Sequence, residues 1–273
     1  MNEILRQKLM RLTRRFGLMT SAERVRGALL AAGSGKANQR FVAEHPGVLL
    51  PPVELMHDPY GVVDYSWYWI TGQQTAGEIS RIARQRCSTG AGPVKIFEWG
   101  CGPARIIRHV GSTPGREFER FASDYNRTMV DWCRANITDV SFDANGLAPP
   151  LRHATASFDF VYCLSVFTHL SEAMYRAWFD ELLRVLKPGG CLLLTLHGDY
   201  YRRKLLPDEC ERYDAGALVV REGFREGGRM FTTFHPERFV RDRLLREVTI
   251  LSHESSENSI AAPQDVWLVR KDA

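Results

Sequence analysis

One short stretch, residues 94–105, constrains the fold of this chain more than any other. It reads Val-Lys-Ile-Phe-Glu-Trp-Gly-Cys-Gly-Pro-Ala-Arg. The apolar run with β-branched and aromatic members predicts a buried parallel strand. Gly100 and Gly102 allow a sharp turn and a close approach of the backbone to a ligand, and Pro103 suits the first turn of a helix. We therefore expect a strand, a turn and a helix, with a ligand beyond the strand's carboxyl end. The same unit without a ligand is the alternative.

The position of a third glycine separates two cofactor classes that use such a turn. A dinucleotide site needs G-x-G-x-x-G, with free helix N–H groups facing a pyrophosphate. Here Arg105 occupies the third position, and Pro103 removes one N–H donor. Glu98 would repel a diphosphate but suits a cationic amino-acid group. The pattern Glu-x-Gly-x-Gly therefore favours S-adenosylmethionine over a nicotinamide dinucleotide.

Length and composition set the class of protein. The 273 residues suffice for one large α/β domain with an appendage. The six cysteines are scattered without a C-x-x-C pair or a histidine at metal-ligand spacing, so we expect reduced thiols and no metal. No run approaches the roughly 18 apolar residues of a membrane span, and the N-terminus lacks the apolar region of a signal peptide. We expect a soluble, cytoplasmic protein.

The basic charge is concentrated at the N-terminus. Residues 1–40 carry nine Lys and Arg against two acids, a net charge of +7, which leaves −3 for residues 41–273 of the total +4. The body is therefore not expected to bind nucleic acid. Residues 2–16 predict an amphipathic helix with arginines on its polar face. It would lie on an anionic membrane surface, dock on the protein itself, or contact a second copy in a homodimer.

Two further N-terminal segments differ in composition. Residues 31–38 are small and polar, which predicts a flexible joint. Residues 46–72 are rich in proline and aromatics, and Tyr and Trp present a large apolar face with a polar tip. We expect this segment to form a lid over a small-molecule pocket; a structural lid without ligand contact is the alternative. The candidate substrate-binding residues are Tyr60, Tyr65, Trp67, Tyr68 and, later in the chain, Tyr200.

From residue 94 onward, strand and helix patterns alternate, as a parallel doubly wound sheet requires. Further strands are expected at 118–123, 140–142, 158–164, 191–196, 248–251 and 265–270, and helices at 73–86, after Asp124, at 172–186 and from His235. The Lys-Pro-Gly-Gly run at 187–190 should end the helix before the fifth strand. The last two strands are joined without a helix, so we expect an antiparallel pair at the edge of the sheet.

Acidic and amide side chains follow the second and third strands. Asp124 closes the second strand, where a carboxylate can accept both hydroxyls of a ribose. A solvated loop aspartate is the alternative. Asp143, Ala144 and Asn145 follow the third strand, where a side-chain oxygen can receive an adenine amino group, and Tyr125 can stack on the ring.

These motifs together resemble class I S-adenosylmethionine-dependent methyltransferases over residues 94–270. The resemblance rests on Glu98-Trp99-Gly100-Cys101-Gly102, Asp124, Asp143-Ala144-Asn145, residues 157–162, Ser165 to Leu170, and Leu186 to Gly190. It implies a Rossmann-like seven-stranded sheet with helices on both faces and an N-terminal helical and aromatic cap. We expect residues 1–92 to be the basic helix and cap, and 93–273 the methyltransferase domain. The implied cofactor-binding residues are Glu98, Gly100, Cys101, Gly102, Asp124, Tyr125, Asp143, Ala144, Asn145 and Leu164.

The Ser-Val-Phe-Thr-His-Leu run and the proline-rich leader resemble bacterial methyltransferases of small molecules, often sugars or glycan precursors. One departure is Trp99 in the glycine motif, where smaller or aliphatic residues are commoner; its side chain must find room against the sheet.

Methyl transfer to a hydroxyl needs positioning, a shielded pocket and a base that accepts the proton. Two histidines follow strands at the carboxyl edge: His169 after the fourth strand and His197 after the fifth. We expect His197 to be the base, because it is the first polar residue after a buried strand; His169 is the second candidate. His235 is more remote.

The leading hypothesis is an O-methyltransferase acting on a sugar or a glycan or glycolipid precursor. An N-methyltransferase acting on an amino sugar or another small amine is the alternative within the same class. A catalytically inactive S-adenosylmethionine-binding partner subunit is the alternative from a different class, and an oxidoreductase is a further one.

Overall fold

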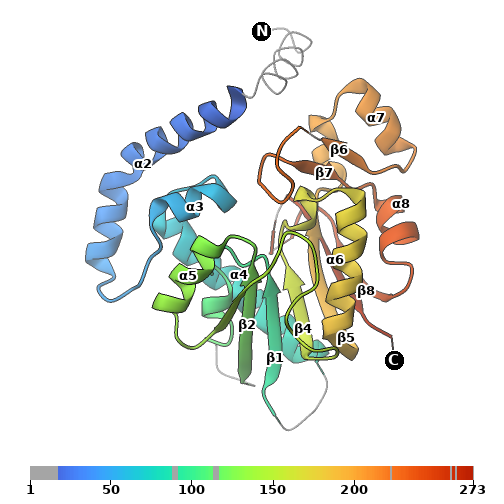
Figure 1. Ribbon diagram of the computed structural model, residues 1–273, viewed down its shortest axis with the longest axis horizontal. Helices are drawn as coiled ribbons and strands as arrows, with labels where there is room; N and C mark the ends of the chain where they lie inside the picture. The colour runs from blue at the N-terminus through green and yellow to red at the C-terminus, as the bar shows by residue number, and fades with distance from the viewer. Residues whose placement is uncertain are drawn as a thin grey trace.

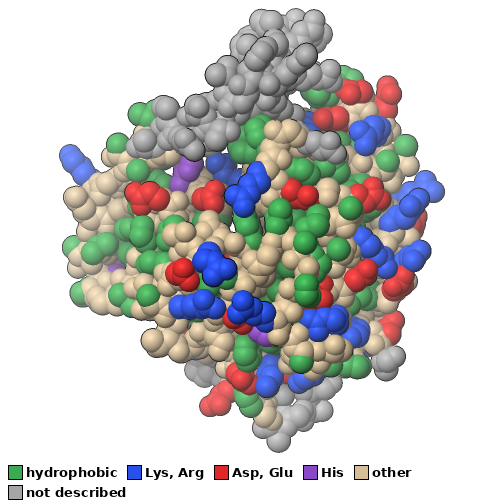
Figure 2. Space-filling model, in the orientation of Figure 1, with side chains coloured by type: hydrophobic (Ala, Val, Ile, Leu, Met, Phe, Trp, Pro, Cys, Tyr) green, Lys and Arg blue, Asp and Glu red, His purple; other side chains and the backbone are tan. Residues whose placement is uncertain are grey.

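The structure is a computed structural model that describes residues 18–87, 92–112, 117–221, 223–258, 260–261 and 263–272. The amphipathic helix predicted for residues 2–16 lies outside these residues. Of the helices described, none offers an apolar stretch long enough to cross a bilayer. Figure 2 shows acidic and basic side chains interspersed on one face of the molecule.

A seven-stranded sheet forms the centre of the molecule, as predicted (Figure 1). Its strand order is β3-β2-β1-β4-β5-β9-β8, and the first five are parallel. The strands are β1 Val94–Trp99, β2 Phe118–Asp124, β3 Ser141–Ala144, β4 Phe158–Cys163, β5 Leu186–Leu196, β8 Thr249–Glu254 and β9 Asp265–Arg270. The predicted late pair is confirmed: β9 runs antiparallel to both β5 and β8, so β8 is the edge strand.

The helices are α2 Leu18–Glu44, α3 Val53–Tyr60, α4 Tyr65–Arg86, α5 Arg127–Asn136, α6 Glu172–Val185, α7 Pro207–Asp214 and α8 Glu237–Phe239, the last continued by a π-helix at Val240–Leu244. Helices α4 and α5 cover one face of the sheet and α6 covers the other, whereas α2 packs against α3 and α4. Side chains Asp64, Asn126 and Ser171 cap the amino ends of α4, α5 and α6 by accepting a backbone N–H. The polar segment after β5 also contains a short hairpin, β6 Val219–Arg221 with β7 Thr232–Phe234, which the sequence pattern did not predict.

Alternation along β1 divides the core into two layers. Val94 and Ile96 pack in the cluster that contains α4 and α5, whereas Phe97 and Trp99 pack in the cluster that contains α6. Trp99 finds its room on that second face, where its ring centroid lies 4.5 Å from that of Trp178. The unusual size of Trp99 is therefore accommodated by the α6 layer rather than by the turn that follows.

The prediction of a flexible joint at residues 31–38 is wrong, because helix α2 runs through these residues. Gly33 and Gly35 face open space, so they weaken the helix by only about 1 kcal/mol each. The helix is anchored beyond them. The Asn38 side chain donates to Val63 O at 2.7 Å and accepts from Tyr65 N at 2.9 Å, and Phe41 is buried. Contacts with the cap thus override the local composition.

Three other features differ from the prediction. Helix α4, expected to begin at residue 73, begins at Tyr65 within the predicted lid segment, with Asp64 as its N-cap. No α-helix follows the glycine turn; residues 102–106 form successive turns that lead into a 3-10 turn at Ile107–His109. Ala104 adopts a left-handed conformation with φ of 60°, which an α-helix does not allow. The fifth strand begins at Leu186, so residues 187–190 lie within it instead of before it.

Candidate functional site

A cavity of about 460 Å³ lies at the carboxyl ends of the parallel strands. Its walls come from the turn after β1, the segment after β2, the segment after β4 and the end of α3 with the start of α4. Figure 1 shows α3 and the β6–β7 hairpin beyond the same end of the sheet. We call this space the central cavity. Its volume falls within the roughly 300 to 1,000 Å³ of small-molecule sites.

The glycine turn forms one wall of the central cavity. Gly100 has φ of +78°, and a Cβ there would lie 2.4 Å from Val166 Cγ2. Its N–H donates to Ser123 O at 2.8 Å, which joins the turn to the end of β2. Gly102 has φ of +52°, and a Cβ there would lie 3.2 Å from the Tyr60 hydroxyl. Cys101 points into the core and is 2% exposed.

Asp124 links the glycine turn to the second strand and lines the central cavity. Its Oδ2 accepts the Gly102 N–H at 2.8 Å, and its Oδ1 accepts the Asn126 N–H at 2.8 Å. Burial raises the pKa of this carboxyl, and the two N–H donors oppose that shift. Asp124 therefore supports the turn and also presents a carboxylate to any ligand in the cavity.

Glu98 does not line the central cavity. Its Oε2 accepts the Ile107 N–H at 3.1 Å and the Tyr162 hydroxyl at 2.9 Å. Burial raises the pKa of this carboxyl to about 8, which the Tyr162 hydroxyl and other contacts moderate. In this structure Glu98 ties the residues after the turn to β4, and it contacts a ligand only if the cavity wall rearranges.

The remaining predicted cofactor residues divide between two spaces. Tyr125 and Leu164 line the central cavity. Asp143, Ala144 and Asn145 instead line a separate cavity of about 230 Å³. Asp143 pairs there with Arg134 at 3.2 Å, and the Asn145 N–H donates to Asp124 O at 3.1 Å. The residues after β2 and those after β3 are thus joined by a backbone hydrogen bond at Asp124, but they line different cavities.

Of the five predicted substrate-binding residues, two line the central cavity, Tyr60 and Trp67 of the aromatic cap. Tyr68 is fully buried and its hydroxyl donates to Pro103 O at 2.7 Å, so it supports the glycine turn without lining the cavity. Tyr65 donates to Pro51 O at 3.1 Å within the cap. Tyr200 is 36% exposed and lies beside the Arg203 guanidinium instead of the cavity.

Tyr201 and Arg105 are among the cavity residues that the sequence did not predict. Tyr201, next to the predicted Tyr200, is a wall residue. Arg105 is another, and its guanidinium carbon lies 5.4 Å from the ring centre of Tyr60 and 5.0 Å from that of Trp67. It donates to Thr71 Oγ1 at 3.0 Å, and its Nε is buried without a hydrogen-bond partner among the described residues. The sequence does contain a signal for this residue, because Arg105 stands where a dinucleotide-binding turn has its third glycine.

His169 lies in the wall of the central cavity, on the 3-10 turn Phe167–His169 after β4. Its Nδ1 is 2.7 Å from Phe231 O. Because a carbonyl oxygen only accepts, Nδ1 carries the hydrogen and Nε2 holds a lone pair. Burial lowers the pKa of His169, so the ring is neutral at pH 7. The ring therefore has the protonation state that a general base requires.

His197 does not emerge toward the central cavity as the sequence analysis expected. The ring is 8% exposed, lies 4.0 Å from the Tyr201 ring in a stacked arrangement, and its Nδ1 contacts Thr233 O at 3.2 Å. Burial lowers its pKa well below 6.5. Gly198 makes room for the Asp265 carboxylate, which would lie 2.2 Å from a Cβ there. The hairpin β6–β7 and Tyr201 thus enclose this histidine.

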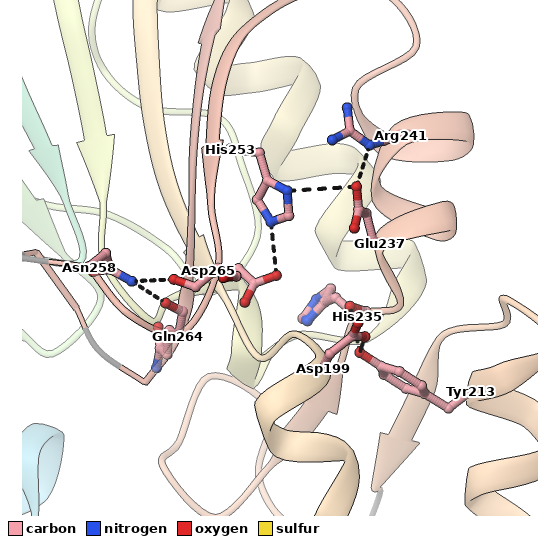
Figure 3. A network of polar contacts seen from close by, with 10 residues as sticks. Asp199, Tyr213, His235, Glu237, Arg241, His253, Asn258, Gln264 and Asp265 are labelled. Atoms are coloured by element: carbon pink, nitrogen blue, oxygen red, sulfur yellow. Dashed lines mark hydrogen bonds and ion pairs between the residues drawn. The ribbon is translucent and has the colours of Figure 1, made fainter.

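Polar contacts continue from the cavity wall at Gln264 to the neighbouring Asp265 and His253, which Figure 3 shows. Gln264, a wall residue, accepts from Thr195 Oγ1 at 2.6 Å and donates to Ser165 Oγ at 2.6 Å. The next residue, Asp265, contacts His253 Nε2 at 3.0 Å, and His253 stacks on Trp267. This network joins the ends of β4, β5 and β9. Among the described residues, no three His, Cys, Asp or Glu side chains are grouped so that they could hold a metal ion.

Comparison with known sequences identifies the central part of the chain. Residues 96–190 match the family described as a methyltransferase domain. Over 120 residues the chain is 27% identical to the tRNA N(3)-methylcytidine methyltransferase of Schizosaccharomyces pombe. That match covers 40% of this chain, and the chain spans only 38% of the length of that curated relative.

Solved structures agree with this result at the level of the fold. One is the 1,6-didemethyltoxoflavin-N1-methyltransferase of Burkholderia thailandensis with S-adenosylhomocysteine bound, at 16% identity and a TM-score of 0.51, covering 77% of this chain and 82% of that one. Another is a glycopeptide N-methyltransferase complexed with S-adenosylmethionine, at 16% identity and a TM-score of 0.52, covering 74% of this chain and 94% of that one.

Proposed function

We propose that this protein, which carries a class I S-adenosylmethionine-dependent methyltransferase domain, methylates a hydroxyl of a small molecule, first of all a sugar or a glycan or glycolipid precursor. S-adenosylmethionine is the cofactor that such a domain takes. In this proposal residues 1–92 are the cap and 93–273 the methyltransferase domain. The single observation that carries the proposal is the neutral imidazole of His169 in the same cavity as the glycine turn and Asp124.

The cofactor would occupy the side of the central cavity formed by the turn and the end of β2. Gly100 lets the backbone approach it, and Asp124 would accept the two ribose hydroxyls. Tyr125 would cover the adenine. Arg105, with an unpartnered buried Nε and no carboxylate within ion-pair distance among the described residues, would receive the carboxylate of the methionyl group. The positive sulfonium would then point toward the segment after β4.

The reaction forms one C–O bond and breaks one S–C bond. An acceptor oxygen attacks the methyl carbon in line with sulfur, and the electron pair of the broken bond returns to sulfur as the sulfonium becomes a neutral sulfide. The acceptor proton passes to His169 Nε2. Because charge is lost on sulfur, the protein contributes chiefly alignment, exclusion of water and this proton transfer. The Phe231 carbonyl holds the ring orientation by accepting from Nδ1.

A small acceptor agrees better with the structure than RNA does, although a tRNA methyltransferase is among the relatives. The central cavity of about 460 Å³ accommodates a small molecule beside the cofactor only if that molecule is compact. Residues 41–273 carry a net charge of −3, which opposes binding of a polyanion. The similarity to the tRNA enzyme covers 120 residues, only 38% of that relative, so its substrate is not carried over to this chain.

The test is a measurement of S-adenosylhomocysteine formation by the purified protein with a panel of sugars and sugar derivatives. We expect turnover with a hydroxylated acceptor, and we expect His169→Gln to lower kcat by about 10² to 10⁴ while cofactor affinity stays within about twofold. His197→Gln, made alongside, should retain most of the turnover, because that ring does not line the cavity.

Three results would overturn parts of the proposal. If S-adenosylhomocysteine does not bind, the assignment of the protein as a methyltransferase is wrong, and neither a hydroxyl nor an amine acceptor is supported. Full turnover of His169→Gln with an amine acceptor would show N-methylation. Loss of turnover in His197→Gln but not in His169→Gln would show that His197, after the fifth strand, is the base.

A further inference from the structure

A second cavity, of about 720 Å³, adjoins the central cavity and is not used by the proposed proton transfer. The two cavities share Asp58, Tyr125, Asn126 and Arg229 as wall residues. The other walls of the second cavity come from the first residue of α5, from the loop between β6 and β7, and from His57 of α3. A molecule that enters the central cavity beside the cofactor can therefore extend into this space. We call it the arginine-lined cavity.

Positive charge dominates these walls. Among the described residues, Arg127, Arg225 and Arg229 line this cavity together with one acidic side chain, that of Asp58. No described carboxylate lies within ion-pair distance of Arg127 or Arg225. Arg225 instead lies 5.8 Å above the ring of Tyr125, at the junction of the two cavities. Both guanidinium groups are therefore without an ion-pair partner among the described residues, and that of Arg225 lies over an aromatic ring.

Helix α5 adds to the positive potential. Its N-cap Asn126 and its first residue Arg127 are both wall residues of the arginine-lined cavity. The N-terminus of a ten-residue helix carries a partial positive charge and free N–H groups. Arginine side chains beside such a helix end favour a phosphate, because the guanidinium donates two parallel hydrogen bonds to phosphate oxygens.

We infer that the arginine-lined cavity binds a phosphate or diphosphate group of the acceptor, so the acceptor is a phosphorylated sugar or sugar nucleotide rather than a neutral sugar. This inference rests on the proposed function, because it assumes that the acceptor hydroxyl reaches the central cavity. Phe224 and Met230 supply apolar wall beside the arginines, which suits the sugar or base next to the phosphate. The phosphate then serves to orient the hydroxyl and takes no part in the methyl transfer.

Isothermal titration calorimetry of the full chain with inorganic pyrophosphate, in the presence of saturating S-adenosylhomocysteine, tests this inference. We expect pyrophosphate to bind the wild-type protein, and Arg127→Gln/Arg225→Gln to weaken that binding at least tenfold. The matched control is Arg238→Gln/Arg246→Gln, which removes the same charge from two exposed arginines that form surface ion pairs. The control should bind pyrophosphate as the wild type does. Circular dichroism and thermal unfolding of each variant check that the helix content and the stability of the fold are retained.

The arms of the experiment separate the possible failures. If S-adenosylhomocysteine binds but pyrophosphate does not, or if both double variants lose pyrophosphate equally, the inference is wrong and the proposed function stands. If S-adenosylhomocysteine itself does not bind, the proposed function fails first. A labelled RNA hairpin that displaces pyrophosphate and binds at least tenfold more tightly would overturn the small-molecule assignment in favour of nucleic acid. If UDP-glucose binds no more tightly than free phosphate, a sugar nucleotide is excluded as the acceptor and a simple sugar phosphate remains.

Discussion

Gly100→Ala tests whether close packing at the glycine turn shapes the site. A non-glycine residue at φ of +78° costs about 1 to 2 kcal/mol. The new methyl group would also lie 2.4 Å from Val166 Cγ2, well inside contact distance, and relieving such an overlap costs about 1 to 3 kcal/mol more. We therefore expect Gly100→Ala to lose about 2 to 5 kcal/mol of unfolding free energy, measured by urea denaturation.

Gly189→Ala is the matched control for this variant. Gly189 has φ of +74°, but a Cβ there would have no atom within 4 Å. It should therefore lose only the conformational part, about 1 to 2 kcal/mol. A second arm adds Val166→Ala, which removes the Cγ2 atom. In the double variant Gly100→Ala/Val166→Ala the overlap is absent, so a coupling energy of about 1 to 3 kcal/mol should appear in the double-mutant cycle.

The same series has a functional readout, because Gly100 and Val166 both line the central cavity. A displaced Val166 narrows that cavity, so Gly100→Ala should weaken S-adenosylmethionine binding, and the added Val166→Ala should restore part of it. The reasoning would be refuted if Gly100→Ala were no more destabilising than Gly189→Ala, or if the coupling energy were zero.

Three further predictions concern the cofactor site. Asp124→Ala should weaken S-adenosylmethionine binding by about 2 to 4 kcal/mol in calorimetry, since two charge-assisted hydrogen bonds to the ribose are removed; undiminished affinity would contradict the ribose role. Burial raises the pKa of Glu98 from 4.5 to about 8, so between these pH values the folded protein holds a proton that the unfolded chain releases. The contribution of this proton to the unfolding free energy is complete below pH 4.5 and is lost as the pH rises toward 8. Relative to Glu98→Gln, the wild type should therefore lose roughly 3 to 5 kcal/mol of unfolding free energy across that range, and parallel pH profiles of the two proteins would disprove this. Methyl transfer should persist in excess chelator, and activity that depends on one added divalent ion would show a metal requirement.

The sequence predicted the sheet well because its strands are encoded locally. Strands β1 and β4 and the second half of β5 are short apolar runs, and polar or glycine residues mark the ends of β1 and β2, at Gly100 and Asp124. The antiparallel end of the sheet followed from the absence of a helix between the last two strands. These features depend on neighbours in the chain and needed no knowledge of distant contacts.

The errors arose where distant contacts decide the outcome. Helix α2 continues through a glycine-rich stretch because Asn38 bonds to Val63 and Tyr65 of the cap, more than 20 residues away. His197 is enclosed because Thr233, in a hairpin that lacks a clear strand pattern, accepts its Nδ1 hydrogen. A sequence indicates which strand end delivers a side chain but not which later segment folds over it.

Arg105 shows a different limit. A residue other than glycine at this position of the motif disfavours a dinucleotide, but the motif does not indicate where the Arg105 guanidinium lies. Only the structure reveals that the side chain turns into the central cavity between Tyr60 and Trp67. A charged residue that replaces a conformational glycine is therefore a candidate ligand as well as a departure from a pattern.

A crystal structure of the protein with S-adenosylhomocysteine tests the central claim most directly. The account predicts the ribose hydroxyls at about 3 Å from the Asp124 carboxylate, the methionyl carboxylate at the Arg105 guanidinium, and the sulfur on the side of the central cavity where His169 Nε2 lies. Density for the ligand confined to the cavity of Asp143, or a sulfur that faces away from His169 toward solvent, would contradict the account.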